Sequence, residues 1–259
     1  MDGSKDTQAP IGGWAQPVGI DVEALKAAGP VLPGAIADAD PEIEAQLYEN
    51  KLNGIGEAME ALNLEVNIES EEPIEPLTSF KDADLHPVVL ENVEKCGYKS
   101  PTAIQAHVIP ALLKNLDIVA VSQTGSGKTA AYMIPIVSKF MGAVQKIGGP
   151  RVDTRMTNYD PEVNKVCAEP LVIIVVPTRE LAHQVLTECR RIAYRSKLLA
   201  VCCYGGIPVK YNLQQLGKGC DILIGTPGRL VDLMSRPDRL SMNRVQYVTL
   251  SSHVWKNCS

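Results

Sequence analysis

One stretch decides the fold: Asp117-Ile118-Val119-Ala120-Val121-Ser122-Gln123-Thr124-Gly125-Ser126-Gly127-Lys128-Thr129, which runs on into Ala130-Ala131-Tyr132. Small and β-branched apolar residues give way to a glycine-bearing turn and then to helix formers. This pattern predicts a strand over 118–121, a loop and then a helix. Glycine leaves room for backbone N–H groups to turn inward, and the helix N-terminus adds partial positive charge. The stretch therefore predicts a loop that binds phosphate, and we call residues 122–129 the phosphate loop.

Two side chains of the phosphate loop carry its expected chemistry. Lys128 is predicted to reach the β- and γ-phosphates of a nucleotide, and the hydroxyl of Thr129 to lie on Mg²⁺. The strict pattern has glycine where this chain has Ser122, so an ordinary turn with an exposed lysine is the alternative interpretation. Lys128 and Thr129 are the candidate catalytic residues, and Thr129 is the candidate metal ligand. The candidate nucleotide contacts in the loop are Gln123, Thr124, Gly125, Ser126, Gly127, Lys128 and Thr129.

Charge divides the 259 residues into two parts. Residues 1–76 hold 16 Asp and Glu against 3 Lys, or −13, whereas residues 77–259 hold 14 against 22, or +8. We expect 1–76 to be a disordered acidic tail. Apolar spacing from Ile43 indicates a weak amphipathic helix in this tail, which either binds a protein partner or forms only transiently without one. The basic remainder suits nucleic acid, and a generic soluble surface is the alternative.

Cysteine usage and apolar runs bear on the location of the protein. None of the seven cysteines is in a C-x-x-C pair or at metal spacing to a histidine, so reduced thiols in an intracellular protein are expected. The first residues include no signal-peptide pattern, and the longest apolar run, 171–176, is too short to cross a membrane. We expect a cytoplasmic monomer, with the nucleus as the alternative location, and no membrane partner.

Strands and helices alternate along the rest of the chain. Residues 171–176 form a continuous apolar run, which is typical of a strand buried on both faces of a parallel sheet. The segment 142–169 is rich in Gly, Asn, Asp and Pro and reads as a surface insertion. The pattern predicts an α/β fold with a parallel sheet and flanking helices. We expect helices at 86–96, 102–114, 128–141, 179–191, 209–216 and 229–234, and further strands at 198–204, 221–225 and 245–250.

Polar and glycine-bearing segments follow three of the expected strands. Function in such sheets lies at the carboxyl ends of the strands, where helix N-termini and hydroxyl groups can bind successive phosphates of one nucleic-acid strand. Each segment alone is only a turn with a helix cap. The candidate RNA contacts are Pro177, Thr178, Arg179, Gly205, Gly206, Thr226, Pro227, Gly228 and Arg229.

An adenine site is suggested by residues upstream of the phosphate loop. The amide of Gln105 can form two hydrogen bonds with the N6 and N7 edge of adenine, and an aromatic ring can stack on the base. Phe80 and Tyr98 are the aromatic candidates.

Together these motifs make residues 78–250 resemble the N-terminal RecA-like domain of DEAD-box ATP-dependent RNA helicases. The insertion before the 171–176 strand is similar to that of the cytoplasmic translation-initiation and germline branch. The resemblance implies that Phe80 and Gln105 select adenine, as in the Q motif of the family. It implies ATP and Mg²⁺ at the phosphate loop, and sequence-independent contact between RNA backbone and Arg179, Gly206, Thr226 and Arg229.

The chain departs from the family after the 245–250 strand. The family has Asp-Glu-Ala-Asp there, whereas this chain has Ser251-Ser252-His253-Val254, and Asp238 is its last carboxylate. Serine cannot replace a carboxylate as a Mg²⁺ ligand or base at neutral pH. The family's Ser-Ala-Thr strand, which lies between the phosphate-loop strand and the 245–250 strand, and the second RecA-like domain have no counterpart in this sequence. We therefore expect negligible ATP hydrolysis and low stability.

Three functions remain compatible with these residues. The first is an ATP-dependent RNA helicase, the second a non-catalytic fragment that binds ATP or RNA, and the third a P-loop kinase or GTPase. The third leaves Phe80, Gln105 and the 226–229 segment unexplained. The predicted architecture is a disordered acidic tail over 1–76, a RecA-like domain over 77–250 that is incomplete at its C-terminus, and a divergent end over 251–259.

Overall fold

A four-stranded parallel sheet forms the centre of the protein, in the strand order β2-β3-β1-β4. The computed structural model describes residues 38–49, 66–70, 73–141, 148–153, 157, 158, 160 and 163–251. In β1, Val172 pairs with Ile222 of β3 on one side and with Tyr247 of β4 on the other. The predicted parallel α/β architecture is therefore confirmed. The elements are α2 (Pro41–Tyr48), η1 (Phe80–Asp82), α4 (Pro87–Lys95), α5 (Ala103–Leu113), α6 (Lys128–Phe140), β1 (Val172–Val175), α8 (Arg179–Ile192), β2 (Ala200–Cys203), α9 (Val209–Leu216), β3 (Ile222–Gly225), α10 (Pro227–Met234) and β4 (Tyr247–Leu250).

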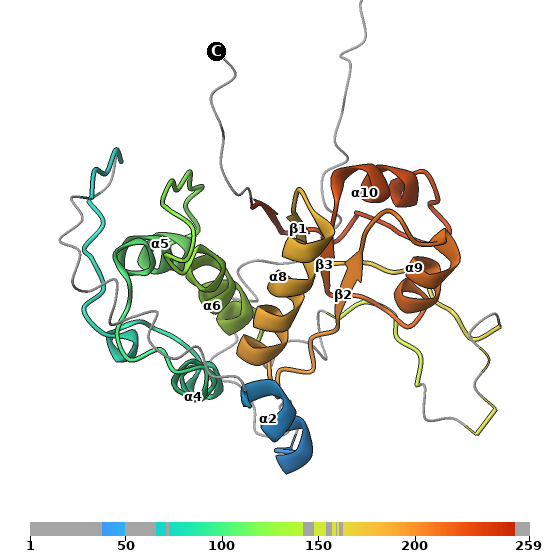
Figure 1. The fold of residues 1–259 in the computed structure, drawn as a ribbon, viewed down its shortest axis with the longest axis horizontal. Coiled ribbons are helices and arrows are strands. Elements are labelled where there is room, and N and C mark those ends of the chain that lie inside the picture. The colour runs from blue at the N-terminus through green and yellow to red at the C-terminus, as the bar shows by residue number, and fades with distance from the viewer. Residues whose placement is uncertain are drawn as a thin grey trace, which may run out of the picture.

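Helices cover the sheet on both sides (Figure 1). The side chains of β3 alternate between two hydrophobic clusters, with Ile222 and Ile224 in one and Leu223 in the other. The first cluster also holds residues of α4, α6 and α8, and the second holds residues of α9 and α10. All four residues of β3 are buried, as a continuous apolar run in a parallel sheet predicts. Within the described residues, no helix is long and apolar enough to cross a membrane.

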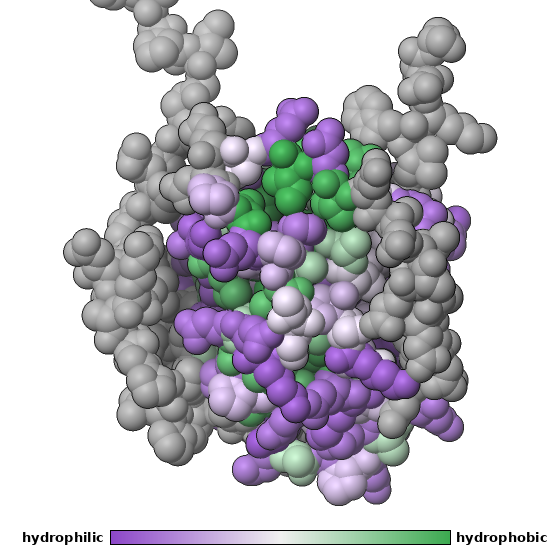
Figure 2. Space-filling model, turned by 90° about the vertical axis from the view of Figure 1, so that its left-hand side faces the viewer, coloured by the Kyte–Doolittle hydropathy of each residue, from purple (hydrophilic) through white to green (hydrophobic). Residues whose placement is uncertain are grey.

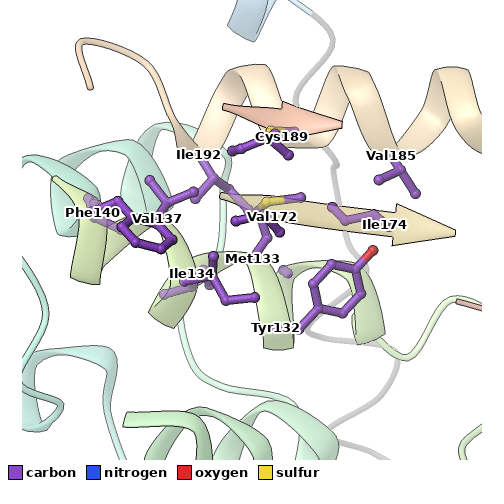
Figure 3. Packing of buried hydrophobic residues seen from close by; sticks show 14 of the residues in the cluster. Tyr132, Met133, Ile134, Val137, Phe140, Val172, Ile174, Val185, Cys189 and Ile192 are labelled. Atoms are coloured by element: carbon purple, nitrogen blue, oxygen red, sulfur yellow. The ribbon is translucent and has the colours of Figure 1, made fainter. Parts of the chain in front are cut away.

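The larger cluster joins α6 and α8 to the sheet (Figure 3). The side chains of β1 meet those of the two helices in the middle of this cluster, and α5 packs along the outside of α6. Burial of a large aliphatic side chain contributes about 1.5–3 kcal/mol, so this cluster supplies much of the stability of the domain. Its fully buried members include Met133, Ile134 and Val137 of α6, Val172 and Ile174 of β1, and Val185, Cys189 and Ile192 of α8.

The strand predicted over 118–121 is wrong. Residues 116–123 form neither strand nor helix, and no described strand pairs with them. Val119 and Val121 are 95% and 94% exposed, and the surface of the molecule that holds α5 and α6 shows a group of hydrophobic side chains at one end (Figure 2). A β-strand needs a neighbouring strand to satisfy its backbone groups, and none of the described strands lies beside this segment.

The described sheet has two edge strands, β2 and β4, and β4 exposes large apolar side chains on one of its faces. Tyr247 faces inward and meets the ring of Phe140 edge-on, with the ring centroids 5.7 Å apart. The alternate residues Val248 and Leu250 point outward and are 63% and 78% exposed. β4 has the period-two pattern of a strand that is covered on one face only.

Part of the predicted acidic tail is a docked helix. The hydroxyl of Tyr48 in α2 donates to the carbonyl oxygen of Arg191 (2.8 Å), and Nε of Arg191 donates to the carbonyl oxygen of Leu47 (2.7 Å). Asp40 caps α2 and also exchanges hydrogen bonds with Tyr194. The amphipathic helix predicted from Ile43 is thus present over 41–48. Its docking on the domain was not predicted, because its partners Arg191 and Tyr194 lie about 150 residues away in the sequence. The remainder of 1–37 and 50–65 lies outside the described residues.

The two described ends of the predicted insertion are anchored at the amino end of β3. Arg151 forms an ion pair with the nearly buried carboxylate of Asp221, with 2.6 Å between Nη2 and Oδ2. The backbone N–H of Val152 donates to Lys218, and that of Val166 to Gly217. Burial raises the pKa of Asp221, against the opposing effects of the Leu199 N–H and of Arg151. The described ends of this segment are therefore tied to the amino end of β3 and do not lie free on the surface.

The expectation of reduced thiols agrees with the structure. Six of the seven cysteines lie in the described residues, and all six are free. Burial raises the pKa of Cys96, Cys189 and Cys203 to about 12, so these thiols stay protonated near neutral pH.

Candidate nucleotide and nucleic-acid site

The phosphate loop is held from behind by the N-terminus of α5. The hydroxyl of Thr102 donates to the carbonyl oxygen of Ser126 (2.8 Å), and the side-chain nitrogen of Gln105 donates to the carbonyl oxygen of Gly127 (3.3 Å). Gly125 and Gly127 have φ angles of 81° and 85°, a conformation that glycine adopts without strain. A Cβ at position 127 would come within 2.4 Å of the Gln105 side-chain nitrogen, so this position also needs glycine for space. The loop is thus built as a tight turn that α5 fixes in place.

The ammonium group of Lys128 forms hydrogen bonds within the phosphate loop. Its Nζ donates to the carbonyl oxygens of Ser122 (2.5 Å) and Gln123 (2.6 Å). Burial lowers the pKa of this ammonium group. The ammonium group therefore occupies the centre of the turn, where its charge is available to an incoming phosphate once these contacts break.

The three predicted adenine contacts lie within the protein. Gln105 is fully buried, and its side-chain oxygen accepts from the Thr102 N–H (3.0 Å). Phe80 is 5% exposed and lies against Tyr98, whose hydroxyl donates to Glu188. The structure thus ties Gln105 to the phosphate loop, and adenine selection by these residues stays a prediction. Two open hollows of the described surface lie beside α2, next to residues such as Pro41 and Tyr48 and away from the loop.

The residues around Thr129 do not complete a Mg²⁺ site. The hydroxyl of the buried Tyr132 lacks a hydrogen bond of good geometry, although the hydroxyls of Thr129 and Ser251 lie close enough to oppose the rise in its pKa that burial causes. Ser251 follows β4 directly, at the position where the family resemblance predicts the first aspartate of Asp-Glu-Ala-Asp. Mg²⁺ prefers charged oxygen ligands, and the described residues contain no cluster of three or more metal-binding side chains. Two hydroxyl groups alone fit Mg²⁺ poorly.

The predicted RNA contacts lie where the parallel strands end, because β1, β2 and β3 all run in the same direction. Pro177, Thr178 and Arg179 follow β1 and are exposed, and Thr178 caps α8 by accepting from the Leu181 N–H (3.2 Å). The pKa of the exposed Glu180 is lowered, first by its backbone hydrogen bond at this helix start and then by the Thr178 hydroxyl. The first turn of α8 therefore already stabilises negative charge.

Arg179 and Gly206 form a contact between two of the three segments. Gly206 has a φ of 84°, and a Cβ there would lie 2.7 Å from Nη1 of Arg179. Glycine at 206 lets the guanidinium group lie against the backbone that follows β2. Gly205 and Gly228 face open space, since a Cβ at either position would meet nothing within 4 Å. These surfaces leave room for a sugar–phosphate chain to approach.

Arg229 has a different environment from Arg179. Its side chain is 9% exposed, its Nη2 donates to the carbonyl oxygen of Ile207 (2.9 Å), and its Nε lies 3.8 Å from Asp232. Its Nη1 is buried and has no hydrogen-bond partner among the described residues. Arg229 therefore ties α10 to the segment after β2. In the same segment Thr226 and Pro227 open α10.

Three contributors to the site were not among the candidate site residues predicted from the sequence. Thr102 binds the phosphate loop, Ser251 lies close to the hydroxyl of Tyr132, and the Ser122 hydroxyl lies 2.5 Å from that of Ser126. The signal for Ser122 was its departure from glycine. The signal for Thr102 was its position just before a helix that precedes a phosphate loop.

Comparison with known proteins places this arrangement in a family. A profile of the DEAD/DEAH box helicase family matches residues 102–250. The chain belongs to the DEAD/DEAH box helicase family. The match begins at Thr102 and ends with β4, so it contains the phosphate loop and all three strand-end segments.

Named relatives of this helicase-family chain agree with the assignment. It is 40% identical over 187 residues to the probable ATP-dependent RNA helicase ddx3 of Dictyostelium discoideum, covering 72% of this chain and 25% of the relative. It is 36% identical over 192 residues to DEAD-box ATP-dependent RNA helicase 52A of Oryza sativa subsp. japonica, covering 74% and 31%. The family is one of ATP-hydrolysing enzymes, and the chain spans about a quarter to a third of the length of these two relatives.

Solved structures support the RecA-like fold of the helicase-family chain. A DEAD box protein from the hyperthermophile Methanococcus jannaschii has 31% sequence identity and a TM-score of 0.53, with 68% of this chain and 41% of that chain covered. The RNA helicase Prp28 from Chaetomium thermophilum bound to ADP has 31% identity and a TM-score of 0.56, with 71% and 40% covered.

Proposed function

We propose that this chain binds ATP at the phosphate loop and RNA backbone at the carboxyl edge of the sheet, as part of an ATP-dependent RNA helicase. The observation that carries the proposal is the glycine turn with Lys128 at its centre, anchored to α5 by Thr102 and Gln105. The relatives bear the name ATP-dependent RNA helicase, and one structural neighbour was solved with ADP.

The nucleotide half of the proposal uses the chain's own backbone. Inward-facing N–H groups of the turn bind phosphate oxygens, and the N-terminus of α6 and the ammonium group of Lys128 stabilise their charge. Mg²⁺ would normally be held by the loop hydroxyl, here Thr129, together with a carboxylate. Because Ser251 stands at the end of β4, we propose that this chain binds nucleotide and hydrolyses it negligibly.

The RNA half of the proposal uses the three segments at the strand ends. Thr178, Arg179 and the glycines at 205, 206 and 228 would contact sugar and phosphate, so binding would not depend on sequence. Arg229 would act on RNA only indirectly, by positioning the segment after β2. A monomer in the cytoplasm, with the nucleus as the alternative, and protein partners bound through the acidic tail complete the proposal.

Nucleotide binding is tested by titrating the purified chain with a fluorescent adenine nucleotide. We expect saturable binding that Lys128→Ala weakens by at least about tenfold, because a charge-assisted contact contributes about 1.5–3 kcal/mol. Phosphate release should not exceed that of Lys128→Ala. The Ser251→Asp variant should make nucleotide binding more dependent on Mg²⁺. Binding that is absent, or unaffected by Lys128→Ala, would contradict the nucleotide half.

RNA binding is tested with a fluorescent single-stranded RNA at several salt concentrations. Arg179→Ala should weaken binding and reduce the salt slope by about one unit if Arg179 contacts a phosphate. Arg195→Ala is the matched control, because it removes the same charge from beyond the other end of α8, where Arg195 pairs with Glu91. Equal effects of the two variants would mean that RNA responds to total charge and does not bind at the strand ends.

A further inference from the structure

The hydroxyl of Ser122 contacts two other residues of the phosphate loop, Ser126 and Lys128. It lies 2.5 Å from the hydroxyl of Ser126 and also accepts from Nζ of Lys128 (3.3 Å). Ser126 is 4% exposed, and its carbonyl oxygen is held by Thr102. The Ser122 side chain therefore links the first residue of the phosphate loop to Ser126 and to Lys128.

The closed loop uses all the hydrogen-bonding capacity of Lys128. An ammonium group has three donors, and the structure gives it three acceptors within the loop: the Ser122 and Gln123 carbonyl oxygens and the Ser122 hydroxyl. A phosphate that binds Lys128 must displace some of these contacts. Nucleotide binding therefore competes with an internal arrangement in which Ser122 supplies two of the three acceptors.

We propose that Ser122 is a positioning residue that stabilises the closed phosphate loop and so lowers the affinity of this chain for nucleotide. The proposal rests on the proposed nucleotide binding. Apparent affinity falls in proportion to the fraction of molecules whose loop is open, so an interaction that favours the closed loop weakens binding without touching the nucleotide. Alanine at position 122 keeps the backbone carbonyl and removes only the hydroxyl contacts.

The first experiment compares nucleotide binding by the full chain and by Ser122→Ala. One intramolecular hydrogen bond changes an equilibrium by roughly three- to tenfold, so Ser122→Ala should bind a fluorescent adenine nucleotide about that much more tightly. The gain should appear mainly as faster association in stopped-flow mixing. Ser122→Thr keeps a hydroxyl and should return the affinity toward that of the unmodified sequence. Equal or weaker binding by Ser122→Ala would overturn the proposal.

A second experiment needs no nucleotide. Acylation of lysine amines, followed by peptide mass mapping, reports how often Lys128 leaves its acceptors, with the 77% exposed Lys81 as internal reference. Lys128 should react severalfold faster in Ser122→Ala than in Ser122→Thr. Equal acylation rates of Lys128 in the two variants would overturn the proposal that the Ser122 hydroxyl holds the loop closed. If the chain binds no nucleotide at all, the proposed function fails, and the acylation rates still decide the role of Ser122.

Discussion

The stretches 118–121 and 171–176 have the same local pattern, an apolar run that ends in a turn and a helix N-terminus, and only the second is a strand. β1 pairs with β3 on one side and with β4 on the other, and Val172 is fully buried. Residues 117–121 donate no backbone hydrogen bond within the described part of the chain, and Val121 is 94% exposed.

The difference shows that an apolar run is not enough to form a β-strand. The backbone groups of the run must also form hydrogen bonds with neighbouring strands. β1 lies between two strands, whereas no described strand pairs with residues 117–121, which connect α5 to α6. The outer edge of β4 is open in the described sheet. Both the segment and this edge expose Val and Leu side chains that a paired and covered strand would bury.

Amide hydrogen exchange should give the largest contrast between the two stretches. Exchange of the β1 amides requires opening of the sheet centre, whereas residues 117–121 are already accessible to water. We expect the β1 amides to exchange more than about a thousandfold more slowly, since core opening in small domains costs several kcal/mol and 1.4 kcal/mol is a factor of ten. Similar protection of both stretches, measured by mass spectrometry, would show that 117–121 is paired in solution.

A matched pair of valine substitutions should give the next largest difference. Val172→Ala removes two buried methyl groups and should lower the free energy of unfolding by about 2 kcal/mol. Val121→Ala changes an exposed side chain and should stay within about 0.5 kcal/mol. Urea unfolding followed by circular dichroism measures both. A cost for Val121→Ala close to that of Val172→Ala would break the comparison.

A pair of glycine substitutions tests whether α5 anchors the phosphate loop. Both Gly125→Ala and Gly127→Ala force alanine to a positive φ, which costs about 1 kcal/mol. Only Gly127→Ala also places a Cβ against the Gln105 side chain, so it should cost about 1 kcal/mol more. The double variant Gly127→Ala/Gln105→Ala should cost less than the sum of the two single variants. Strict additivity in urea unfolding would mean that the contact between α5 and the loop is weak.

The smallest expected effect is a pH dependence of the free energy of unfolding, caused by the His86 cap of α4. His86 caps α4 by accepting from the Val88 N–H through its Nδ1 (3.2 Å), and burial lowers its pKa below 6.5. A lowered pKa means that the folded state favours the neutral ring. The contribution of the cap is therefore present above pH 6.5 and is lost as the pH falls through the folded-state pKa. The loss should stay below about 1 kcal/mol, the usual contribution of a cap.

The control for this prediction is His86→Asn, which keeps a capping acceptor that does not titrate. Thermal unfolding between pH 7.5 and 5.5 should show a smaller loss of stability in this variant than in the unmodified chain. His107, whose pKa burial also lowers, remains in both proteins and contributes equally. An identical pH dependence would show that His86 does not contribute.

Much of the fold and part of the site could be predicted from local sequence. The four strands of the sheet and the helices between them appear within a few residues of the expected bounds, because apolar periodicity and helix caps act over short distances. The glycine turn over 125–127 was predicted for the same reason. α2 was placed within the tail because its docking depends on Arg191 and Tyr194, far away in the sequence. The burial of Arg229 depends in the same way on Ile207 from a different strand end.

The sequence by itself determined the parallel α/β class, the phosphate loop and the family, since each follows from the order of residue types along one stretch. The tertiary structure alone decided that 118–121 is not a strand, that Gln105 is bonded to the loop, and that Ser122 closes the loop around Lys128. The physical reason is that hydrogen bonds and burial belong to pairs of groups. A sequence shows which groups are present, and only the folded chain shows which of them meet.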